Sequence, residues 1–169
     1  METKVLVNRI FEIVNLLAEN EGVALFASRK KGFENWLKVE LSGILQKDGR
    51  VELEKNYTVN SNRKRIDIIF NNEWAISLKD WKRSVYKGRS SLLKNINALK
   101  EAPYNNYKKS CLVFLTFSPR GKKKDYDNKI ESAFKKENIT YYEKKDFPFN
   151  NTVFKNNNEG RLWFVPRTN

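Results

Sequence analysis

The sequence predicts an α/β fold: a single domain with a mixed central β-sheet flanked by helices. Two observations lead to this prediction. Helical periodicity comes first along the chain, a meander of strands follows, and helices then alternate with strands to the end. The 169 residues suffice for one hydrophobic core and leave little room for a second. Because no internal repeat or interdomain linker interrupts the pattern, we assign residues 1–169 to one domain.

The first half of the chain is predicted to hold two helices and three strands. Residues 1–18 and Gly32–Gln46 show apolar residues at helical spacing, and the turn Lys47-Asp48-Gly49 ends the second helix. The period then changes to two. The predicted strands are Val51–Tyr57, Arg65–Phe70 and Trp74–Lys79.

The second half is predicted to alternate helices with strands. A helix over Ser90–Lys100 is followed by Ser110–Phe117, whose apolar run is typical of a strand buried on both faces. The remaining predicted elements are a helix at Lys124–Lys136, short strands at Ile139–Tyr142 and Leu162–Val165, and an exposed loop at Asn150–Gly160.

Charge and absent residue types narrow the function. The formal charge of +13 and pI near 9.8 favour a polyanionic partner such as nucleic acid, although the chain could simply be basic. Without histidine, Ser-His-Asp hydrolysis and His-ligated zinc are excluded. The one cysteine, Cys111, allows no disulfide within the chain and is expected to be buried. No apolar run of about 20 residues and no signal-peptide pattern occur, so we expect a cytoplasmic protein with no membrane association.

The two strands around Asn71-Asn72-Glu73 bring a carboxylate and an ammonium together. A three-residue loop pairs Phe70 with Trp74, Ile68 with Ile76 and Ile66 with Leu78, which makes one apolar face. On the other face, Asp67 lies opposite Ser77, and Lys79 follows two residues further along.

A second carboxylate, Glu40, occurs within a helical apolar stripe. It is spaced by four residues from both Trp36 and Ile44. A buried carboxylate needs a cationic partner or a metal. The alternatives are a salt bridge to a basic residue of the sheet, or a helix rotated so that Glu40 lies at the edge of its stripe.

These segments together resemble a known nuclease superfamily. Phe33-Glu34-x-Trp36-Leu37-x-x-Glu40-Leu41, then Arg65-Ile66-Asp67-Ile68, then Ala75-Ile76-Ser77-Leu78-Lys79 are similar to the core of the PD-(D/E)xK, or restriction endonuclease-like, superfamily. The similarity extends loosely from Phe33 to Tyr142, and the motif is short and degenerate.

The resemblance implies an endo- or exodeoxyribonuclease that uses Mg²⁺ or Mn²⁺. Asp67 would be the central metal ligand, Glu40 an accessory ligand, and the Leu78 backbone carbonyl a further ligand. Lys79 would orient the attacking water and stabilise developing charge. Oxygen ligands suit Mg²⁺, which polarises phosphate and supplies hydroxide near neutral pH. DNA is favoured over RNA by the same resemblance, and a homodimer is possible.

Ser77 departs from the family pattern, because the second acidic ligand is expected at its position. Glu40 is the favoured replacement, Glu52 or Glu54 could reach in from the preceding strand, and Asp80 points to the opposite face. The alternative is a protein that keeps the nuclease fold and binds nucleic acid without cleaving it.

Basic residues around this motif are candidates for nucleic-acid binding. Arg63, Lys64 and Arg65 flank the Asp67 strand. After Lys79, cations alternate with aromatic residues that could contact a base or sugar, or could equally pack at the sheet edge. The candidates in this second group are Trp81, Lys82, Arg83, Lys87 and Arg89.

Overall fold

The α/β fold is confirmed in a computed structural model, which describes residues 1–19, 33–81, 85–119, 121–149 and 158–167. In chain order the elements are α1 (Thr3–Glu19), α3 (Phe33–Gln46), β1 (Val51–Val59), β2 (Asn62–Phe70), β3 (Trp74–Trp81), α4 (Val85–Ala98), the 3₁₀ turn η1 (Tyr104–Asn106), β4 (Lys109–Pro119), α5 (Lys123–Lys136), β5 (Glu143–Phe149) and β6 (Asn158–Pro166). No helix in these described ranges is long and apolar enough to span a membrane.

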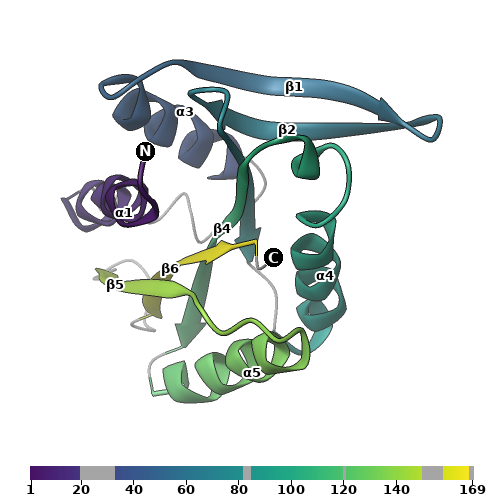
Figure 1. Cartoon of the computed structure of the whole chain (residues 1–169). Helices are drawn as coiled ribbons and strands as arrows, with labels where there is room; N and C mark the ends of the chain where they lie inside the picture. Colours follow the sequence, from purple (N-terminus) through teal and green to yellow (C-terminus); the bar gives the residue numbers. More distant parts are fainter. Residues whose placement is uncertain (20–32, 82–84, 120, 150–157, 168–169) are drawn as a thin grey trace.

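The strands form one mixed sheet in the order β1-β2-β3-β4-β6-β5. Strands β3 and β4 are parallel, and the other neighbouring pairs are antiparallel. The parallel pair needs a crossover connection, which α4 supplies. Strands β1 and β5 are the two edges, so the hairpin of β1 and β2 lies at one side of the sheet (Figure 1).

Two hydrophobic clusters cover the two faces of the sheet. Helices α1 and α3 pack on one face, and α4 and α5 pack on the other (Figure 1). Strand β4 contributes Cys111, Val113 and Leu115 to the first cluster, and Leu112 and Phe114 to the second. The prediction of a strand buried on both faces is therefore confirmed. Burial also raises the pKa of the Cys111 thiol.

Strand β5 begins later than the sequence predicted. The predicted strand Ile139–Tyr142 is wrong, because this stretch is the irregular connection that follows α5. Ile139 donates its backbone N–H to the Phe134 carbonyl and is buried, while the Tyr142 ring packs 4.9 Å from the Phe134 ring. The apolar residues thus fix the connection, and the charged residues after them pair with β6.

The predicted loop Asn150–Gly160 is only partly described. Residues 150–157 lie outside the described part of the chain, and β6 already begins at Asn158. Strand β6 is therefore longer than the predicted Leu162–Val165. Its pairing with β4 runs from Asn158–Pro119 to Pro166–Cys111.

Candidate functional site

The site begins where β2 and β3 separate. The register predicted for the hairpin is confirmed for Ile68–Ile76 and Phe70–Trp74, but the ladder ends there. Beyond it β2 stays paired with β1, and β3 stays paired with β4. The predicted contact of Ile66 with the same apolar face is wrong, because Ile66 packs in the cluster on the α4 side. We call the place where the two strands part the β2–β3 fork.

Asp67 closes the inner end of this fork. Its Oδ2 accepts a hydrogen bond of 2.8 Å from the backbone N–H of Leu78. The carboxylate thus replaces a backbone acceptor that β2 no longer supplies. Because the N–H and C=O of one strand residue point to the same side, the Leu78 carbonyl also points toward the fork. Asp67 itself is almost fully buried.

A pocket of about 320 Å³ opens beside Asp67. We call it the Asp67 pocket. It gathers residues from the hairpin, from β3 and from the helical side of the sheet. Its lining consists of Lys64, Arg65, Asp67, Ser77, Lys79, Asn95, Ala98 and Tyr104. The predicted residues Asp67, Ser77 and Lys79 therefore do come together, with two of the predicted basic residues.

Helix α3 reaches the fork from the other face through Lys38. Its ammonium lies 2.5 Å from Oε1 of Glu54 and 3.9 Å from Oδ1 of Asp67. The side chain is only 5% exposed. Lys38 therefore bridges the carboxylates of Glu54 and Asp67, which lie close to each other on either side of its ammonium. Such a buried ammonium is tolerated because it is paired.

Glu54 is the second carboxylate near Asp67. It lies on β1, where its backbone adopts a positive φ of 54°, and its partner across β2 would be Asp67. The hydrogen bond from Lys38 lowers the pKa of Glu54, and the charge of Arg65 lowers it further. Arg65 lies 3.4 Å from Glu54 and 3.9 Å from Asp67. One of the replacements considered for the missing acid is thus close to Asp67.

Lys79 and Tyr104 also line the pocket. The Lys79 ammonium lies 3.2 Å from Oε1 of Glu34 on α3 and is a third exposed. Tyr104 donates its hydroxyl to the Arg65 carbonyl at 3.3 Å and is hydrogen-bonded to Ser77. Burial raises the pKa of Tyr104 to about 12, against the opposing effect of the Ser77 hydrogen bond. Tyr104 is therefore a neutral hydrogen-bonding group at physiological pH.

Glu40 does not line this pocket. The buried residues of α3 are Phe33, Leu37, Lys38, Leu41, Ser42, Ile44 and Leu45, and Glu40 is half-buried beside them. The helix is thus rotated so that Glu40 lies at the edge of its stripe. Glu34 and Lys38, four residues apart, are the charged side chains of α3 that reach the fork.

The predicted nucleic-acid contacts are described only in part. Arg63 and Arg65 are exposed, and Lys64 pairs with Glu101 at 3.3 Å. Lys82 and Arg83 lie outside the described residues, as do the side chains of Trp81, Lys87, Arg89 and Asp80. Lys38, Glu34 and Tyr104 were missed from the sequence. The spacing of Glu34 and Lys38 beside the Leu37–Leu41 stripe was a signal for the first two.

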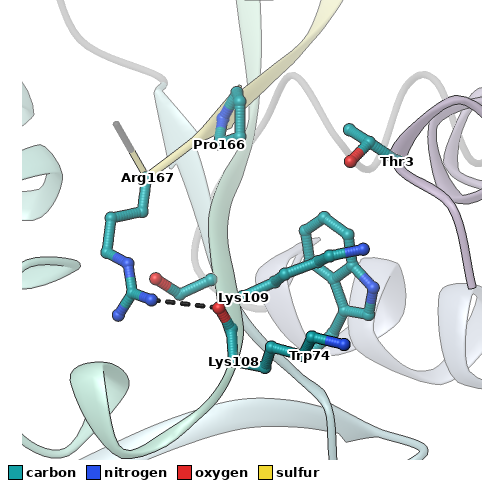
Figure 2. Close-up of a pocket in the computed structure, with 7 residues that line it drawn as sticks. Thr3, Trp74, Lys108, Lys109, Pro166 and Arg167 are labelled. Atoms are coloured by element: carbon teal, nitrogen blue, oxygen red, sulfur yellow. Dashed lines mark hydrogen bonds between the residues drawn. The ribbon is translucent and has the colours of Figure 1, made fainter. Parts of the chain in front are cut away.

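A second polar hollow lies at the other end of β3, where Lys109 extends along the ring of Trp74 (Figure 2). We call it the Trp74 pocket. Its volume is about 280 Å³, and it is lined by Thr3, Trp74, Lys108, Lys109, Ser110, Pro166 and Arg167. The Arg167 guanidinium donates to the Lys108 carbonyl at 3.1 Å. This lining contains cations and no carboxylate.

No family model, no curated protein and no solved structure matches this chain. In the described part of the chain, no group of three or more potential metal-ligating side chains of the His, Cys, Asp and Glu types occurs either.

Proposed function

We propose that this protein is a metal-dependent nuclease whose reaction takes place in the Asp67 pocket. The observation that carries the proposal is the arrangement at the β2–β3 fork. Asp67 and Lys79 line one cavity there, and beside it β3 is no longer paired with β2, so that the Leu78 N–H bonds to the Asp67 carboxylate instead. Phosphodiester hydrolysis needs these kinds of groups: oxygen ligands for a divalent cation and a positive charge for the phosphate.

The oxygen donors of the fork fit Mg²⁺ or Mn²⁺ in their chemistry. Asp67 offers a carboxylate, Leu78 a backbone carbonyl directed toward the fork, and Glu54 a second carboxylate. Hard oxygens of these kinds are the ligands that Mg²⁺ prefers, and water completes its shell. When bound, the ion would polarise a phosphate oxygen and lower the pKa of a water molecule. Ser77 could contribute only a neutral hydroxyl, so Glu54 would be the residue that supplies the second negative charge.

The cations of the pocket would bind and orient the substrate. Lys79 is held by Glu34, which leaves further donor positions of its ammonium for a phosphate oxygen or for the attacking water. Lys64 and Arg65 place two more cations in the lining of the same pocket. Together they would align the phosphodiester against Asp67, and stabilise the charge that develops on its oxygens.

The position of Lys38 favours a second candidate function. Its ammonium already bridges Glu54 and Asp67, so a divalent cation at these oxygens must displace it. If it is never displaced, Lys38 acts as a permanent counter-ion, and the protein binds nucleic acid without cleaving it. Charges pair fully without a metal in that case, because Lys38, Arg65 and Lys79 face Glu54, Asp67 and Glu34.

A cleavage assay separates the two functions. Supercoiled, linear, branched and single-stranded DNA and an RNA would be incubated in EDTA, Mg²⁺ or Mn²⁺. Asp67→Asn keeps the acceptor for the Leu78 N–H but removes the charge, and Lys79→Ala removes the pocket ammonium. The matched control is Lys108→Ala, which removes a lysine from the Trp74 pocket.

We expect metal-dependent cleavage that both pocket variants reduce by at least about 100-fold and the control leaves unchanged. Binding without cleavage in any metal would instead support the counter-ion function of Lys38. Cleavage that persists in Asp67→Asn would exclude the Asp67 pocket as the active site.

A further inference from the structure

The hairpin of β1 and β2 extends well beyond the Asp67 pocket, and its tip projects past α4 (Figure 1). The turn at the tip is formed by Asn60 and Ser61, which both have positive φ values of 48° and 62°. Such two-residue turns follow the right-handed twist of the strands and make a regular two-stranded ribbon. Residues 55–66 of this ribbon contain four basic residues and no acidic one.

One face of the ribbon is fixed to the body of the protein. Ile66 is fully buried in the cluster on the α4 side, and Tyr57 packs against the same cluster. The Tyr57 hydroxyl is hydrogen-bonded to that of Tyr107, and the Lys64 ammonium donates to the Ala102 carbonyl at 3.2 Å. These contacts fix the part of the ribbon up to Tyr57 and Lys64 to the body of the protein.

The opposite face of the ribbon is exposed and polar. In the ladder Asn56 pairs with Arg65, and Thr58 pairs with Arg63, so the four side chains share one face. All four are exposed. We call this the outer face of the hairpin. Arg63 donates to the Asn56 amide oxygen at 3.2 Å, which keeps the two side chains side by side.

We propose that this outer face enters the major groove of duplex DNA, with Asn56 and Arg63 contacting base edges. This inference rests on the proposed action on nucleic acid and extends it to the form of the substrate. A two-stranded ribbon fits the major groove of B-form DNA, which is about 12 Å wide. Arginine and asparagine are the side chains that pair with guanine and adenine edges there. The A-form major groove of duplex RNA is too narrow for such a ribbon.

The outer face also leads to the Asp67 pocket. Its innermost member, Arg65, lines that pocket and lies 3.9 Å from Asp67. A duplex held by Asn56 and Arg63 would therefore have its sugar-phosphate backbone beside the carboxylate. The hairpin thus selects a duplex and delivers it to the fork.

The test is DNA binding measured in EDTA, which separates binding from cleavage. Fluorescence anisotropy of labelled duplexes at one fixed salt concentration would compare wild type with Asn56→Ala/Arg63→Ala. The matched control, Asn128→Ala/Lys135→Ala, removes one asparagine and one cation from exposed positions of α5, at the end of the molecule opposite the hairpin (Figure 1). Thermal unfolding checks that both double variants fold.

We expect wild type and the control to bind duplex DNA equally, and the hairpin variant to bind at least about tenfold more weakly. A duplex with 7-deazapurines lacks the N7 acceptor of the major groove. Wild type should bind it more weakly than ordinary duplex DNA, whereas the hairpin variant should bind the two duplexes equally. Duplex RNA of the same sequence should bind more weakly than DNA.

Three outcomes would overturn the inference, and they differ in what else they affect. If wild type binds duplex DNA and the hairpin variant binds it equally well, the hairpin is not the reader, and the proposed nuclease is untouched. If wild type binds duplex RNA or the 7-deazapurine duplex as tightly as ordinary duplex DNA, only the claim of major-groove contact fails. If wild type binds no nucleic acid, the proposed function and the role of the hairpin fail together.

Discussion

Two pockets of similar size lie at the two ends of β3, and they differ in one chemical respect. The Asp67 pocket has a volume of about 320 Å³ and combines a buried carboxylate with three cations. The Trp74 pocket has a volume of about 280 Å³, and its lining also carries three cations but no carboxylate. Size and positive charge therefore do not single out the proposed active site. What distinguishes the Asp67 pocket is a buried carboxylate within its lining, whereas at the Trp74 pocket Lys108 and Lys109 pair with Glu73, which is not part of the lining.

The backbone explains why a carboxylate lines the pocket at the fork. At the fork β2 leaves β3, so Leu78 has no backbone partner there and Asp67 accepts its N–H. At the Trp74 pocket the backbone is closed, since Arg167 donates its N–H to the Ser110 carbonyl. The Arg167 guanidinium also donates hydrogen bonds to backbone carbonyls, including those of Tyr107 and Lys108. Where two strands stop pairing, an unpaired backbone N–H needs a side-chain acceptor, and that side chain is then available to bind a ligand.

Replacement of Lys38 should have the largest effect on stability at the Asp67 pocket. Lys38→Met removes an almost fully buried ammonium and leaves two carboxylates without it. In EDTA, we expect the free energy of unfolding to fall by about 2 kcal/mol. This is less than for a wholly buried pair, because Glu54 is half exposed. Urea unfolding measures this loss, and added Mg²⁺ should restore part of it if the ion takes the place of the ammonium.

Lys64→Met is the matched control for Lys38. Its partner Glu101 is exposed, and Lys64 itself is 37% exposed. Surface ion pairs of this kind contribute about 0–1 kcal/mol, so stability should change by no more than about that amount. A similar loss for both variants would contradict the special role of Lys38 at the fork. A loss for Lys38→Met that Mg²⁺ never reverses would favour the permanent counter-ion.

The protonation of Glu54 should have a smaller effect, which appears only in acid. Its pKa is lowered from the ordinary value of 4.5, chiefly by the hydrogen bond from Lys38. A carboxyl whose pKa is lowered in the folded state stabilises the protein fully above its ordinary pKa. That stabilisation is lost as the pH falls through the lowered value. Glu54→Gln should therefore flatten the pH dependence of unfolding below about pH 4.5. Urea unfolding measured between pH 7 and 3 tests this, and an unchanged slope would contradict the ion pair.

Much of the fork could be predicted from the sequence because it depends on local register. The three-residue loop after Phe70 fixes the pairing of Ile68 with Ile76, and hence the neighbourhood of Asp67, Ser77 and Lys79. Alternation and loop length decide such a register, and both are visible in the chain. The separation of the strands beyond that pair was not visible. It also places Ile66 on the opposite face from Ile68.

The helical partners of the fork could not be predicted with the same success. The sequence places Glu40 between Trp36 and Ile44 in the apolar stripe of α3, and leaves open a rotated helix with Glu40 at the edge of that stripe. The structure shows the rotated helix, since Glu40 is only half-buried. This rotation places Lys38, and not Glu40, at the fork. Tyr104 lies in a short turn after α4, and its approach to Ser77 is set by tertiary packing. No periodicity reports such a contact.

Binding of Mn²⁺ to the isolated protein, measured by titration calorimetry, tests the central claim most directly. Wild type, Asp67→Asn, Ser77→Asp and Lys108→Ala would be compared. We expect one Mn²⁺ site in wild type that is lost in Asp67→Asn and kept in Lys108→Ala. Ser77→Asp should strengthen Mn²⁺ binding by about tenfold or more, because it adds a carboxylate to the lining of the pocket that Asp67 shares. If wild type binds no Mn²⁺, or if Asp67→Asn binds it equally well, the Asp67 pocket is not a metal site and the proposed nuclease mechanism is wrong.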